Sequence, residues 1–201
     1  MSIANYFTFI RIVISPIFLF VYLEHEWLGI SAIMLPYVLL VLLAISELSD
    51  AFDGFLARRY NQVTDLGKVL DPMADSIARI SVFLTFTLEP VNLPMPIIFI
   101  FLYRDSVVST LRTICALKGF ALAARTSGKI KAVIQAIAAF IVLILMIPYS
   151  LGDITKETLH NTGTAIIGVA ALYTIYSGVD YIRANWLYIR KLLYPQMHSQ
   201  Q

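Results

Sequence analysis

Long apolar runs, separated by short breaks rich in polar residues, glycine and proline, repeat along the whole chain. An apolar run of about 20 residues can cross the ~30 Å hydrocarbon layer of a membrane as one helix. The pattern predicts six such helices, over residues 6–23, 31–58, 66–88, 95–118, 128–148 and 160–185. We therefore expect an all-α, polytopic membrane protein with six transmembrane helices, with one membrane domain over residues 1–195 and a short polar tail over 196–201.

Composition supports a membrane protein rather than a soluble one. Hydrophobic residues make up 59% of the 201 residues and charged residues only 14%, whereas soluble domains carry about 25% charged residues. The single cysteine, Cys115, cannot form an internal disulfide. The three histidines lack the paired spacing of zinc ligands. We expect neither a zinc site nor a nucleic-acid partner.

Basic residues are concentrated in alternate breaks between the predicted helices. The breaks after helices one, three and five contain one Lys or Arg, Lys156. The breaks after helices two and four and the C-terminal end contain most of the others, namely Arg58, Arg59, Lys68, Lys118, Arg125, Lys129, Lys131, Arg183, Arg190 and Lys191. Because cytoplasmic loops are enriched in Lys and Arg, this pattern predicts that both termini are cytoplasmic.

Four aspartates lie within the second and third predicted helices. Asp50 and Asp53 are three residues apart, and Asp71 and Asp75 are four apart, so each pair faces one side of its helix. An aspartate near the bilayer centre costs roughly 2.5 to 3.5 kcal/mol, so a compensating positive charge is needed. One candidate is salt bridging to the arginines Arg58, Arg79, Arg104 and Arg112. The other is divalent metal, because carboxylates without His or Cys favour Mg²⁺ or Mn²⁺, and two pairs suit a two-metal site.

Two glycines lie close to these aspartates, inside the predicted helices, where glycine is unfavourable. Gly54 directly follows Asp53, and Gly67 lies four residues before Asp71. Glycine costs about 1 kcal/mol within a helix, so it indicates either close helix packing or close approach of a nucleotide or diphosphate to the backbone. Arg58, four residues after Gly54, lies on the same face and could bind a diphosphate.

The motif DxxDGxxAR, followed after eight residues by GxxxDxxxD, resembles the signature of the CDP-alcohol phosphatidyltransferase family. The family resemblance implies that two Mg²⁺ or Mn²⁺ ions are bound by four aspartates, Asp50, Asp53, Asp71 and Asp75. It implies that the CDP-lipid is bound by Asp50, Gly54, Ala57, Arg58, Gly67 and Asp71. It further implies that Asp75 is the general base and that the protein is a homodimer.

The acceptor is indicated by basic residues in the fourth predicted helix and the break after it, which suit an alcohol with its own phosphate. The segment from Arg104, with the opening Asn5, Thr8, Arg11 pattern, is similar to bacterial family members that form phosphatidylglycerophosphate. This resemblance implies transfer from CDP-diacylglycerol to sn-glycerol 3-phosphate, with the acceptor phosphate held by Arg104, Arg112 and Lys129. Ser76, where lysine is common, and Asp105, where glutamate is common, depart from that pattern.

Several alternatives stay open from the sequence. Inositol phosphate, phosphatidylglycerol or serine could replace glycerol 3-phosphate, although a basic pocket disfavours serine, which has no phosphate. A cation transporter would also place carboxylates among membrane helices, and a purely structural membrane protein is the third possibility. For the enzyme, we expect a bacterial inner membrane with the active site facing the cytoplasm, so that the lipid tails stay in the bilayer while the soluble acceptor and CMP exchange.

Overall fold

The computed structural model of the chain describes residues 3–59, 65–117 and 125–193. Within these ranges, the side chains of residues 3–7, 51, 53–59, 65–72, 116 and 191–193 are not described. The described ranges contain no strand, and the expected all-α class is confirmed. The helices are α1 (Ile3–Leu23), α2 (Leu35–Arg59), α3 (Asp65–Thr85), α4 (Met95–Leu117), α5 (Thr126–Leu151), α6 (Lys156–Ala184) and α7 (Trp186–Leu193).

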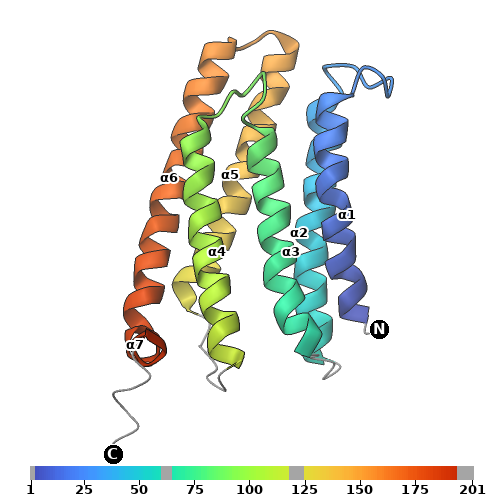
Figure 1. Cartoon of the computed structure of the whole chain (residues 1–201). Helices are drawn as coiled ribbons and strands as arrows, with labels where there is room; N and C mark the ends of the chain where they lie inside the picture. Colours follow the sequence, from blue (N-terminus) through green and yellow to red (C-terminus); the bar gives the residue numbers. More distant parts are fainter. Residues whose placement is uncertain (1–2, 60–64, 118–124, 194–201) are drawn as a thin grey trace, which may run out of the picture.

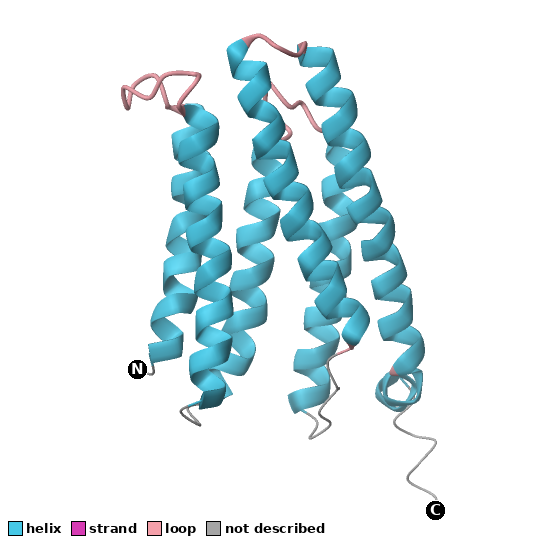
Figure 2. Cartoon of the chain, turned by 180° about the vertical axis from the view of Figure 1, so that it is seen from behind, coloured by secondary structure: helices cyan, strands magenta, loops and turns pink. Residues whose placement is uncertain are grey.

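The long helices α1–α6 run side by side along one axis, as Figures 1 and 2 show from opposite sides. The start of α1 and the end of α6 lie at the same end of the bundle, and α7 turns away from the axis there (Figure 1). Helix α1 packs against α2 and α3, while α6 packs against α4 and α5, and α2 contacts α5 between the two groups. Helix α3 also contacts both α4 and α5.

The six predicted helices correspond to α1–α6, with differences at their ends that follow from local hydrogen bonds. Helix α2 begins four residues later than predicted, after a turn in which the Ser31 hydroxyl accepts a bond from the Met34 N–H at 3.3 Å. Helix α6 begins earlier, because Thr155 caps it by accepting from the Thr158 N–H at 3.2 Å. The short helix α7 was not predicted, since eight residues give no long apolar run.

Aromatic residues pack the bundle toward the end opposite the termini. Phe83 of α3 stacks on Phe101 of α4 with ring centroids 4.6 Å apart, and Phe18 of α1 meets Phe86 edge-on at 6.5 Å. All four rings are almost fully buried. Such pairs add about 0.5 to 1.5 kcal/mol beyond the burial of their area. The aromatic core therefore closes one end of the bundle, and polar side chains gather nearer the other.

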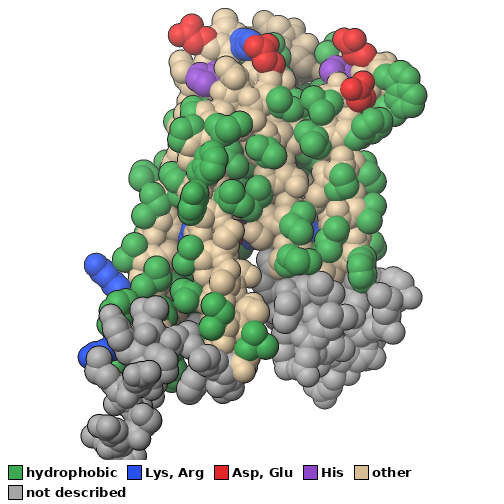
Figure 3. All heavy atoms as spheres, in the orientation of Figure 1, with side chains coloured by type: hydrophobic (Ala, Val, Ile, Leu, Met, Phe, Trp, Pro, Cys, Tyr) green, Lys and Arg blue, Asp and Glu red, His purple; other side chains and the backbone are tan. Residues whose placement is uncertain are grey.

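The outer surface of the bundle is largely apolar. Hydrophobic side chains cover the middle of the face seen in Figure 3, while Asp, Glu and His side chains lie at its upper end. Exposed large residues include Val13 on α1, Val133 on α5 and Leu172 on α6. Apolar surface of this extent is unusual for a soluble monomer and typical of a lipid or protein contact.

Two of the described helices, α5 and α6, are long and apolar enough to cross a membrane. The apolar part of α1 that the structure describes, Thr8–Leu23, is shorter. Helix α4 carries three ionisable residues, Arg104, Asp105 and Arg112, within its apolar stretch. Six membrane spans and the side on which the termini lie therefore stay predictions.

Candidate functional site

Arg11 of α1 joins two of the four signature aspartates. Its Nη1 donates to the Asp50 Oδ1 of α2 at 2.7 Å and also forms an ion pair with Asp75 of α3. Arg11 is 2% exposed, whereas the two carboxylates are about one-third exposed. The contact requires α1 to pack against both α2 and α3. A single cation can thus contact Asp50 and Asp75 together, which shows that the two carboxylates converge.

The other residues of the signature lie on the same two helices, outside the described side chains. Asp53, Gly54, Ala57 and Arg58 fall in the last part of α2. Gly67 and Asp71 fall in the first turns of α3. No group of three or more His, Cys, Asp or Glu side chains suited to a metal occurs among the residues whose side chains are described. The expected four-aspartate site is therefore described for Asp50 and Asp75 alone.

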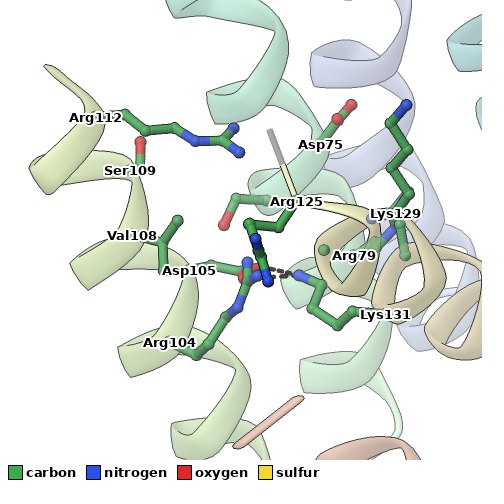
Figure 4. A pocket seen from close by; sticks show the side chains of 13 residues that line it. Asp75, Arg79, Arg104, Asp105, Val108, Ser109, Arg112, Arg125, Lys129 and Lys131 are labelled. Atoms are coloured by element: carbon green, nitrogen blue, oxygen red, sulfur yellow. Dashed lines mark hydrogen bonds and ion pairs between the residues drawn. The ribbon is translucent and has the colours of Figure 1, made fainter. Parts of the chain in front are cut away.

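A cavity of about 250 Å³ opens between α3, α4 and α5, next to Asp75. Figure 4 shows it with side chains from these helices around it. Its charged lining consists of Asp75, Arg79, Arg104, Asp105, Arg112, Arg125, Lys129 and Lys131. Six of these groups are cationic and two are anionic, so the cavity suits an anionic ligand. The three residues expected to hold the acceptor phosphate lie in one cavity with the expected base.

Asp105 fixes two of the cations in this cavity. Its carboxylate accepts from Lys131 Nζ at 2.7 and 3.0 Å and from Arg104 Nη1 at 2.9 Å. Arg104 also donates from Nη2 to the Ser177 hydroxyl of α6 at 2.8 Å. Asp105 and Lys131 are both buried, and paired burial is how proteins tolerate such charges. One carboxylate against two cations leaves positive charge available to a ligand.

Helix α6 also supports the cations at the edges of the cavity. Arg112 donates from Nε to the Tyr181 hydroxyl at 3.3 Å, and its guanidinium lies 5.4 Å from the centre of that ring. Arg125, just before α5, binds Asp180 through two hydrogen bonds of 3.2 and 3.0 Å. The Ser127 hydroxyl donates to the same carboxylate at 2.6 Å. The hydrogen bonds that Arg125 donates to Asp180 raise the pKa of Arg125, which stays protonated.

Arg79 and Glu47 extend the charged cluster between the carboxylates and the cavity. Arg79 Nη2 lies 4.0 Å from Asp50 Oδ2, and its Nε lies 3.7 Å from Glu47 Oε1. The salt-bridge explanation of the aspartates thus holds in part, for Arg79, but the closer partner is Arg11. The sequence analysis assigned no function to Glu47. It used Arg11 only as part of a family pattern, and Lys131 only as one of the basic residues after the fourth predicted helix. A charged residue inside an apolar helix is energetically costly, and this cost could have marked these three residues as functional candidates.

Comparison with known proteins gives a consistent result. Residues 1–176 match the family described as CDP-alcohol phosphatidyltransferase. A Bacillus subtilis protein named CDP-diacylglycerol–glycerol-3-phosphate 3-phosphatidyltransferase is 31% identical over 194 residues, covering 92% of this chain and 95% of the relative. Proteins of the same name from Rickettsia bellii and Salmonella paratyphi A are 32% and 30% identical over 185 and 191 residues, each covering 91% of this chain and 94% of the relative.

Proposed function

The chain belongs to the CDP-alcohol phosphatidyltransferase family, and we propose that it transfers the phosphatidyl group of CDP-diacylglycerol to sn-glycerol 3-phosphate. The products are phosphatidylglycerophosphate and CMP, as the names of the similar proteins indicate for those proteins. The observation that carries the choice of acceptor is the cavity in which Asp75 lies beside Arg104, Arg112 and Lys129. In this cavity, the phosphate of the alcohol would meet cationic side chains, and its hydroxyl would meet a proton acceptor.

The described carboxylates fit a divalent metal. Asp50 and Asp75 come from different helices and both contact the Arg11 guanidinium, so one cation reaches both. Oxygen donors without His or Cys are the set that Mg²⁺ and Mn²⁺ prefer. Asp50, Asp53, Asp71 and Asp75 would hold two such ions. Bound there, the ions would neutralise the diphosphate and make its phosphorus more electrophilic.

Side chains of the protein would then promote the displacement of CMP by the acceptor alcohol. Asp75 accepts the proton of the acceptor hydroxyl while the alcohol oxygen attacks the lipid-bearing phosphorus. The bond from this phosphorus to the oxygen of CMP breaks, and CMP leaves with the electron pair. Arg104, Arg112 and Lys129 hold the acceptor phosphate, which keeps the hydroxyl near the base. The CDP moiety lies along α2 and α3, at Gly54, Ala57, Arg58 and Gly67.

We further propose that α1–α6 all span a bacterial inner membrane, with both termini and the active site on the cytoplasmic side. The shortest of them, α1 and α3, have 21 residues, which gives about 32 Å at 1.5 Å per residue and matches the hydrocarbon layer. Helices with charged residues can span because those residues face the bundle interior, as Asp105 does. The family resemblance also favours a homodimer.

The deciding experiment is CMP release by the purified protein in detergent with CDP-diacylglycerol and Mg²⁺. Glycerol 3-phosphate, inositol phosphate, phosphatidylglycerol and serine are compared as acceptors, with a reaction lacking acceptor as the control. We expect release with glycerol 3-phosphate alone. Release with another acceptor would keep the chemistry and overturn the substrate. No release with any acceptor, together with cation flux in proteoliposomes lacking nucleotide, would favour a transporter instead.

A further inference from the structure

Arg79 lies at the boundary between the signature carboxylates and the basic cavity. It follows Asp75 by one helical turn on α3 and lines the same cavity. Its Nη2 lies 4.0 Å from Asp50, and its Nε lies 3.7 Å from Glu47, one turn before Asp50 on α2. Among the described side chains that line the cavity, Arg79 is the cation contributed by α3. Its guanidinium therefore faces the donor-binding helices and the acceptor cavity together.

The N–H donors of Arg79 make fewer hydrogen bonds than those of Arg104, which lines the same cavity. Arg104 donates hydrogen bonds to Asp105 and Ser177 at 2.9 and 2.8 Å. The two carboxylate contacts of Arg79, at 3.7 and 4.0 Å, exceed hydrogen-bond length. Its Nε is buried without a hydrogen-bond partner in the part of the chain that is described. A guanidinium has five N–H donors, and a buried donor without a hydrogen bond is costly. Arg79 therefore has donors left to bind an oxyanion in the cavity.

We propose that Arg79 binds the acceptor phosphate beside Arg104 and Arg112, and that Glu47 is a positioning residue that orients Arg79 toward the cavity. The inference rests on the proposed function and deepens it by assigning the acceptor subsite nearest Asp75. An ion pair on the Glu47 side limits the directions in which the guanidinium can point. Arg79 also lines the cavity, and a planar guanidinium can bind two phosphate oxygens at once.

The test compares steady-state constants for both substrates in Arg79→Gln, Arg79→Lys and Glu47→Gln. Loss of a charge-assisted hydrogen bond predicts that Arg79→Gln raises the KM for glycerol 3-phosphate by about tenfold or more. The KM for CDP-diacylglycerol changes by less than about threefold. Arg79→Lys keeps the charge but loses the planar pair of N–H donors, so its KM for glycerol 3-phosphate lies between those of the wild type and Arg79→Gln. Glu47→Gln raises the acceptor KM about two- to fivefold, because Arg79 stays but loses its orientation.

Arg183→Gln is the matched control, because Arg183 is exposed on α6 and does not line the cavity. A second readout needs no turnover: glycerol 3-phosphate without CDP-lipid raises the Tm of the wild-type protein in detergent, and Arg79→Gln abolishes that shift. If Arg79→Gln does not fold, a Tm shift in Arg79→Lys that is clearly smaller than the wild-type shift supports the proposal.

Two results would overturn the inference. One is an acceptor KM and a Tm shift that equal the wild-type values in the Arg79 variants. The other is an equal rise of both KM values, which would mean that Arg79 only balances the charge of Glu47 and Asp50. Absence of CMP release by wild type would instead refute the proposed function, and the dependence of the Tm shift on Arg79 would still decide the binding role.

Discussion

Arg11 supplies positive charge that two signature aspartates need inside the bundle. It is almost fully buried, and its guanidinium contacts Asp50 and Asp75 on different helices. Uncompensated, a buried charge of either sign would be costly, so the three side chains stabilise one another. Asp75 has a second environment, because it also lines the basic cavity. This residue therefore links the donor-binding carboxylates to the acceptor-binding cations.

Replacing Asp75 with Asn is expected to abolish turnover while CDP-lipid binding stays measurable. The amide keeps the shape of the carboxylate but cannot accept the hydroxyl proton, and general-base loss typically costs a factor of about 10² to 10⁴. Asp50 still contacts Arg11, so the donor side changes only in part. CMP release measures the first effect, and the CDP-diacylglycerol-induced rise in Tm measures the second. Turnover near the wild-type rate would remove Asp75 from the role of base.

At the level of single residues, the sequence predicted the identity of the charged groups better than their pairing. The spacing within the pairs Asp50–Asp53 and Asp71–Asp75 indicated that each pair shares one helix face. The basic residues Arg104, Arg112 and Lys129 were expected in a pocket for the acceptor phosphate. The Arg11 contacts could not be predicted, because they depend on how α1 packs against α2 and α3. The Asp105 contact with Lys131 likewise joins α4 to α5. Sequence spacing specifies neighbours within a helix but not across helices.

Helix α6 acts as a scaffold for the cavity, although its residues do not line it. Ser177 and Tyr181, one turn apart, bind Arg104 and Arg112 of α4. Between them, Gly178 allows α6 to approach the stem of Arg104, because a Cβ at this position would lie 3.1 Å from the Arg104 Cγ. That distance is too short for ordinary packing. The absence of a Cβ at Gly178 therefore leaves room for Arg104 in its present orientation.

Gly178→Ala is expected to raise the KM for glycerol 3-phosphate about two- to fivefold through displacement of Arg104. Alanine favours a helix over glycine by about 1 kcal/mol, so the free energy of unfolding changes little despite the closer contact. Gly168→Ala, ten residues earlier in α6, is the matched control, since a Cβ there has no atom within 4 Å. Acceptor titrations on both variants measure the difference. Equal KM values for the two would contradict the scaffold role of Gly178.

The elements themselves were largely predictable from the apolar runs. Six expected segments match α1–α6, because a helix must satisfy its own backbone hydrogen bonds when it is surrounded by apolar groups. The ends were less predictable, since hydroxyl groups such as those of Ser31 and Thr155 decide where a helix begins. Helix α7 was missed because it is short and begins directly after Asn185, which caps α6.

Across the whole molecule, the two ends of the bundle differ in charge. The loops at one end carry Glu24, Glu26, Glu89 and Asp153, with Lys156 beside them, and Lys156 pairs with Glu89 at 2.6 Å. The opposite end carries Arg125, Lys129, Arg183 and Arg190. The two tryptophans, Trp27 and Trp186, are exposed at opposite ends. Both features are typical of a protein that spans a bilayer, with its basic end in the cytoplasm.

The proposed orientation predicts which surface cysteines a membrane-impermeant maleimide can reach. The single native cysteine, Cys115, is buried, so the wild-type protein serves as an unlabelled control. In right-side-out bacterial spheroplasts, Glu26→Cys is expected to be labelled directly, whereas Arg190→Cys is labelled only after the membrane is opened. Both positions are exposed in the folded chain, so access depends on the membrane rather than on burial. Direct labelling of Arg190→Cys would place the basic end and its cavity outside, where cytoplasmic glycerol 3-phosphate could not enter.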